Sequence, residues 1–300
     1  AYLSVVALVV LVSLVSGATS SVTDAVSSLG SSMLTVKIED DKGYPVTLDT
    51  LTEWMEKNAA RFRNADEMEE AAPEAYEEWL STPAPWLDGK CPGCAFDGCT
   101  DGAALVQLLR DYVGSDISVP DPLLERIADL KDEAAVMALL TDKAAPCEAR
   151  MMAIDLLTQM ESTAPMVDYL RWQVERTEDD DLLDKSIEAL DEMGECVKGP
   201  ALIAFRAADR KGKDYLLDVL CNFPGDEDVF QYTLRRFKES PNERALFAGY
   251  LAKLEDDRAL EALLDVAESD DVKYIDFIEI RSAIERLGSE APVRDFSNDP

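Results

Sequence analysis

Histidine is absent from this 300-residue sequence, and basic residues are scarce beside acidic ones. Without histidine, the chain lacks the commonest general base and the commonest metal ligand of proteins. The 29 Lys and Arg against 61 Asp and Glu give a formal net charge of -32, which repels a nucleic-acid backbone. No nucleophile-elbow, P-loop or HExxH motif occurs either. The sequence therefore predicts a protein that is not an enzyme, with no cofactor, no metal site and no nucleic-acid partner.

Charged side chains are also missing from the first 23 residues, and the first Lys or Arg is Lys37. An apolar run without a polar face is typical of a membrane span rather than a surface helix. At about 1.5 Å per residue, such a helix reaches roughly 34 Å, enough to cross a bilayer core of about 30 Å. A secretion signal would carry basic residues before the apolar run. We therefore expect residues 1–33 to form a hydrophobic assembly or transmembrane helix.

The opening AYLSVVALVVLVSLVSGATSSVTDAVSSLG resembles the N-terminal helix and Ser/Thr/Gly-rich continuation of the type IV pilin superfamily, notably Flp/Tad pilins. DDKGYPVTLDTL, residues 40–51, is similar to the stretch after the long helix of pseudopilins, although Val5 stands where bacterial pilins usually carry glutamate. The resemblance covers about the first 50 residues. It implies a chain anchored in the inner membrane before assembly, which then polymerises with copies of itself into an extracellular cell-surface filament. The assembly residues it implies are apolar or small: Leu3, Val6, Ala7, Val10, Ser13, Leu14 and Gly17.

Residues 34–119 are expected to form a small adapter. The alternation of apolar and polar residues in MLTVKIEDDKGYPVTL predicts a β-hairpin, the alternative being a longer first helix followed by an extended linker. Thr50 followed by Glu53 forms a capping box that opens a helix. PEAYEEWLS predicts a second short helix that starts with Pro73 and ends before Pro83.

The adapter also contains a cysteine-rich loop, CPGCAFDGCTDG. Its C-x-x-C pair allows three interpretations. A zinc site requires further ligands, and a thioredoxin-like site requires a strand and helix context that is missing here. Asp97 and Asp101 are too few to predict a calcium site. We expect structural disulfides drawn from Cys91, Cys94, Cys99, Cys147 and Cys196, and a buried thiol at Cys221.

Helical apolar patterns recur from residue 120 onward. Leucine landmarks stand 33, 30, 34 and 33 residues apart, at Leu157, Leu190, Leu220, Leu254 and Leu287. A period of this length, with two helices per unit, is typical of an α-solenoid. Helices are expected to begin at Pro146 and Pro241 and to end at Gly194.

The clearest repeat, DDRALEALLDVAESDDVKYIDFIEIRSAIERLG, resembles a HEAT repeat of the phycobilisome-lyase-like type. Its first helix is expected to run from Arg258, and its second to stop at Gly288. The apolar positions assigned to this helix pair are Leu260, Leu263, Leu264, Val266, Ile275, Ile278, Ile284 and Leu287. Surfaces of such repeats usually bind protein partners rather than catalyse reactions.

The expected protein is mostly α-helical. It has a hydrophobic helix (1–33), an adapter (34–119), a HEAT-like α-solenoid (120–290) and a tail (291–300). Together with the pilin resemblance, this organisation predicts a filament subunit that displays an acidic head. One alternative is a membrane-anchored HEAT-repeat scaffold that faces outward and binds a protein partner. A second alternative is a thiol-disulfide protein that uses Cys91 and Cys94.

Overall fold

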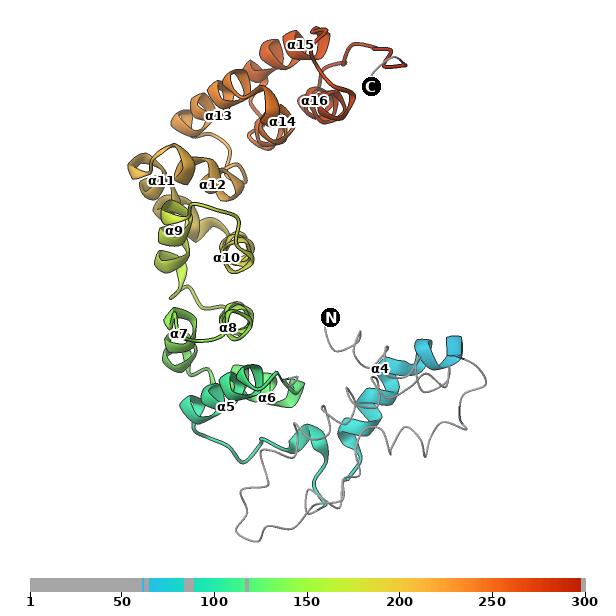
Figure 1. Ribbon diagram of the computed structural model, residues 1–300, viewed down its shortest axis with the longest axis vertical. Helices are drawn as coiled ribbons and strands as arrows, with labels where there is room; N and C mark the ends of the chain where they lie inside the picture. The colour runs from blue at the N-terminus through green and yellow to red at the C-terminus, as the bar shows by residue number, and fades with distance from the viewer. Residues whose placement is uncertain (1–60, 62–64, 84–88, 117–118, 298–300) are drawn as a thin grey trace. The chain divides into compact units, whose positions relative to one another are not determined.

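The computed structural model describes Arg61 and residues 65–83, 89–116 and 119–297 (Figure 1). These residues form thirteen α-helices, α4 to α16, and they contain no strand, so the described chain is mostly α-helical as predicted. The hydrophobic helix expected over residues 1–33, the β-hairpin and the capping-box helix lie outside the described residues. Within the part of the chain that is described, no helix is both long and apolar enough to span a membrane.

The chain divides between Ser162 and Thr163 into two compact units, here called unit 1 and unit 2. In unit 1, α5 packs against α6 and α7 packs against α8, while α4 contacts the 3-10 turn η3. Fully buried side chains such as Leu109, Leu123, Leu140 and Ile154 form its core. The elements are α4 (Ala65–Ser81), η3 (Pro92–Cys94), α5 (Gly102–Gly114), α6 (Asp121–Leu130), α7 (Glu133–Thr141) and α8 (Cys147–Gln159).

Helix α4 corrects one prediction. Pro73 lies inside the helix rather than at its first turn, because the strong helix formers Ala, Glu and Met dominate residues 65–72 and extend the helix toward the N-terminus. The helix ends at Ser81, before Pro83, as predicted. Trp79 is buried and stacks on Tyr76, with the ring centroids 5.8 Å apart.

Unit 2 consists of four consecutive helix pairs. One member of each pair lies on one side in Figure 1 (α9, α11, α13, α15, the first-helix layer), and the other member lies on the opposite side (α10, α12, α14, α16, the second-helix layer). Contacts within pairs and between neighbouring pairs are compatible with an α-solenoid. The helices are α9 (Met166–Glu175), α10 (Asp181–Glu192), α11 (Lys198–Ala207), α12 (Arg210–Leu220), α13 (Glu227–Glu239), α14 (Arg244–Lys253), α15 (Leu260–Glu268) and α16 (Tyr274–Arg286).

Some of the many acidic residues cap the N-termini of helices in both units. In five α-helices, the residue before the first turn is an aspartate whose carboxylate accepts a hydrogen bond from a backbone N–H three residues later. This contact satisfies a donor that the helix itself cannot pair, and it places negative charge at the positive end of the helix dipole. The five residues are Asp101, Asp132, Asp180, Asp209 and Asp226.

The leucine landmarks mark the ends of every second helix. Leu157, Leu190 and Leu220 lie in the last turns of α8, α10 and α12, while Leu254 and Leu287 cap α14 and α16. The first four are buried, which confirms that the predicted period corresponds to one helix pair. The predicted boundaries are also confirmed: Pro146 caps α8, Pro241 opens the turn η5 (Pro241–Glu243) before α14, and Gly194 follows α10 with a φ of 69°.

The last helix pair ends where predicted, but α15 begins at Leu260 rather than Arg258, and the core differs in part. Gly288, with a φ of 83°, follows the end of α16. Ile275 and Ile278 were expected inside the repeat, yet they are 75% and 42% exposed. The buried stripe of α16 instead follows Phe277, Ile280, Ala283 and Ile284, at spacings of three and four residues.

Candidate partner-binding site in the second unit

A hollow of about 650 Å³ opens in unit 2, at the second-helix layer. Its volume falls within the roughly 300 to 1,000 Å³ of typical ligand sites. Helix α12 supplies half of the lining residues, and α13, η5, α14 and the segment before α10 supply the rest. The lining residues are Asp179, Arg210, Lys211, Asp214, Tyr215, Asp218, Arg236, Glu243, Leu246 and Tyr250.

Arg236 is the buried charge of this hollow, with only 4% of the residue exposed. Its Nε and Nη2 atoms donate to the two carboxylate oxygens of Asp214, each at 2.9 Å. Nη2 also donates to Glu243 at 2.9 Å, and Nη1 donates to the Ser240 hydroxyl. All three guanidinium nitrogens are therefore engaged within the protein, which is what a buried arginine requires.

Asp214 is fixed from a second direction by Tyr232. The Tyr232 hydroxyl donates to Asp214 Oδ1 at 2.7 Å. Burial and the adjacent Asp214 raise the pKa of Tyr232, so the phenol stays protonated and remains a donor. Asp214 thus accepts three hydrogen bonds, and both of its oxygens are occupied.

Asp218 lies one helical turn after Asp214 and is fixed less completely. The Tyr250 hydroxyl of α14 donates to Asp218 Oδ1 at 2.7 Å. Burial, followed by the charge of Asp218, raises the pKa of Tyr250 and keeps this donor protonated. Among the described residues, Asp218 Oδ2 accepts no hydrogen bond, so a half-buried carboxylate presents one oxygen that is still free to bind.

Tyr215 and Asp179 also line the hollow. The guanidinium of Arg176 lies 3.9 Å from the centre of the Tyr215 ring and 2.9 Å from an Asp184 oxygen. Asp179 is 3.8 Å from Arg176, and its side chain is 95% exposed. Lys211 donates from Nζ to the Thr177 carbonyl at 3.0 Å. Tyr215 thus packs against a buried arginine, while the Asp179 carboxylate faces solvent.

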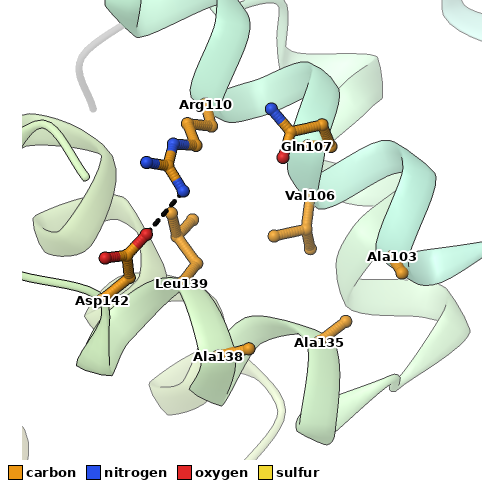
Figure 2. A pocket seen from close by; sticks show the side chains of 8 residues that line it. All are labelled: Ala103, Val106, Gln107, Arg110, Ala135, Ala138, Leu139 and Asp142. Carbon is orange, nitrogen blue, oxygen red and sulfur yellow. Dashed lines mark hydrogen bonds and ion pairs between the residues drawn. The ribbon is translucent and has the colours of Figure 1, made fainter. Parts of the chain in front are cut away.

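A smaller hollow of about 240 Å³ lies in unit 1 between α5 and α7. In Figure 2, the ion pair between Arg110 and Asp142 closes one end, with its atoms 2.6 Å apart. Ala103, Ala135 and Ala138 line the other end, and their short side chains leave the space between the helices open (Figure 2). This volume lies below the usual range of ligand sites, so the hollow of unit 2 is the stronger candidate.

The cysteines follow the expected disulfides only in part. Cys91 and Cys94 form a disulfide across η3, which packs against α4 and α6. Cys99, Cys147 and Cys196 were also candidates for disulfides, but they carry free thiols. Cys221 is a free and fully buried thiol, and burial raises its pKa. Asp101, in the same loop as the disulfide, accepts a hydrogen bond from the Ala104 backbone N–H and so serves as a helix cap.

The predicted assembly residues Leu3, Val6, Ala7, Val10, Ser13, Leu14 and Gly17 lie outside the described residues. The sequence-based search did not identify the residues around the hollow of unit 2. A signal for one lining pair exists, because the hydrogen-bonded residues Asp218 and Tyr250 are 32 residues apart, close to one repeat. Asp191 and Asn222, a hydrogen-bonded pair outside the hollow, are similarly 31 residues apart. Comparisons of the chain with protein-family models, curated proteins and solved structures find no match.

Proposed function

We propose that the chain is a HEAT-like α-solenoid scaffold that binds a protein partner in the hollow of unit 2. The observation that carries the proposal is the combination of a ligand-sized hollow with a rigid polar lining. Arg236, Asp214 and Tyr250 are fixed by part-buried hydrogen bonds before any partner arrives, so binding need not order them. Leu246 is 51% exposed at the same place and offers an apolar contact. Surfaces of stacked helix pairs are well suited to such binding.

Peptide display on the full chain tests this proposal. Random peptides are selected on the wild-type chain and counter-selected on Leu246→Asn, which removes the apolar contact without adding a charge. Ile203→Asn is the matched control, because Ile203 is 71% exposed on α11 in the first-helix layer. We expect enriched peptides that bind the wild type and Ile203→Asn but not Leu246→Asn. Equal binding to all three proteins would refute the proposal.

A second function concerns residues 1–23, which carry no charged side chain. We propose that this segment, which resembles a type IV pilin helix, joins copies of the chain into a cell-surface filament that displays the helical head. Exposing its Leu and Val side chains to water would cost about 1.5 to 3 kcal/mol each, so a bundle of such segments is a favourable alternative to lipid. Val10→Asp is expected to abolish fibres in material sheared from cells. Normal fibres from this variant would exclude the filament, and recovery only in detergent-solubilised membranes would favour a membrane-anchored scaffold.

A further inference from the structure

We propose that the hollow of unit 2 takes a basic peptide segment, with a Lys or Arg side chain bound by Asp218 and Asp179 and a neighbouring apolar side chain against Leu246. The inference rests on the proposed function, because it names the chemistry of the partner bound at that same hollow. It follows from which charges of the lining are already neutralised within the protein and which are not.

One cation of the lining is fully paired within the protein. Arg236 is buried, and all its nitrogens are engaged by Asp214, Glu243 and Ser240. Lys211 gives one of its three N–H donors to the neutral Thr177 carbonyl and keeps its charge. Arg210 is exposed, and its side chain makes no hydrogen bond to a described residue. The sign of the partner therefore depends on the anions of the lining and on the charge of the surrounding unit.

The anions are less committed. Asp218 uses one oxygen for Tyr250, and Asp179, which is 95% exposed, uses one oxygen for the Tyr215 hydroxyl at 3.5 Å and for Arg176 at 3.8 Å. The surroundings have the same sign, since residues 163–300 contain 33 Asp and Glu against 18 Lys and Arg. The field of this unit therefore attracts a cationic partner and speeds its encounter.

A bare metal ion does not fit this site. Within the described ranges, no group of three carboxylate or thiol ligands is arranged to hold one. Separated carboxylates beside an aromatic ring and an exposed leucine instead suit a long cationic side chain, whose alkyl stem packs on apolar atoms while its head pairs with a carboxylate. Lys and Arg in an extended peptide have this form.

The probe for the test is the fluorescein-labelled peptide GSKLSKLSG, compared with GSELSELSG and GSQLSQLSG by fluorescence anisotropy on the full chain. We expect the Lys peptide to bind most tightly, and to bind more weakly as NaCl rises from about 50 to about 500 mM. Asp218→Asn should weaken it about five- to tenfold, because the amide oxygen still accepts from Tyr250 but the charge is lost. Glu261→Gln, on α15 in the first-helix layer, removes the same charge elsewhere and should leave the affinity within about twofold.

The Arg210→Gln variant tests whether the partner carries positive or negative charge. Removing this cation should tighten binding of the Lys peptide about twofold, and weakened binding would overturn the proposal. Binding of the Glu or Gln peptide as tight as that of the Lys peptide, with loss in Leu246→Asn, would refute the basic partner and leave the hollow as a binding site. Failure of all three peptides to bind would also refute the basic partner, while the display experiment judges the hollow itself.

Discussion

Replacing Arg236 by leucine tests whether the hollow is built on a rigid ionic network. The substitution keeps most of the apolar stem but deletes the guanidinium that binds both Asp214 oxygens and Glu243. Removing one partner of a buried pair costs about 3 to 5 kcal/mol, because the other charge is left uncompensated. The Asp214 side chain is 26% exposed and keeps its hydrogen bond from the Tyr232 hydroxyl, so we expect a loss of stability at the low end of this range, about 3 kcal/mol. For a unit of this size, that loss lowers Tm by roughly 6 to 12 °C.

Differential scanning calorimetry of the full chain measures this change in the transition of unit 2. Arg235→Leu is the matched control, because Arg235 is the neighbouring arginine and is exposed, and its effect should stay within about 0.5 kcal/mol. In a double-mutant cycle with Asp214→Asn, the double mutant should lose at least about 1 kcal/mol less stability than the sum of the two single variants. Equal effects of Arg235→Leu and Arg236→Leu would show that the network does not stabilise the hollow.

Three further predictions concern stability and thiol chemistry. In urea denaturation, Gly212→Ala should lower the free energy of unfolding by about 1 to 3 kcal/mol, because the added Cβ would lie 3.1 Å from Val174 backbone atoms. The added Cβ of Gly249→Ala meets no atom within 4 Å, so this variant should raise the free energy of unfolding by about 0.5 to 1 kcal/mol. Burial, followed by the charges of Glu125 and Glu77, raises the pKa of Asp121 to about 6, so the free energy of unfolding should fall as pH rises from about 4 to about 6. The Asp121→Asn variant should have a free energy of unfolding about 1 to 2 kcal/mol above that of the wild type at pH 7, and an unchanged one at pH 4. Without reductant, DTNB should titrate four thiols after denaturation but react slowly with Cys221 in the native chain, and six thiols would disprove the disulfide.

The helices from α8 onward were predictable from local signals. Pro146, Gly194 and Gly288 fixed helix boundaries through backbone geometry, and the leucine period located the helix pairs. These signals act within a few residues or repeat at fixed spacing, so the sequence alone carries them. The start of α4 was missed because helix-forming residues before Pro73 outweighed the preference of proline for a first turn.

The site depended on packing that local patterns do not report. Asp214 and Arg236 are 22 residues apart on different helices, and nothing near either residue indicates that they bind each other. Ile275 and Ile278 were predicted to be buried but are exposed. Their spacing fits a buried helix face, but burial also requires a neighbouring element that covers that face. The contact between Tyr250 and Asp218 lies between these cases, since it joins helices one repeat apart.

Hydrogen–deuterium exchange of the full chain, with and without saturating GSKLSKLSG, tests the central claim most directly. Occupancy of the hollow should slow exchange in α12, η5 and the first turns of α14, while α15 and the helices of unit 1 remain unchanged. Protection centred on any other helices, or bound peptide without protection in α12 and α14, would contradict the assignment of this hollow as the partner-binding site.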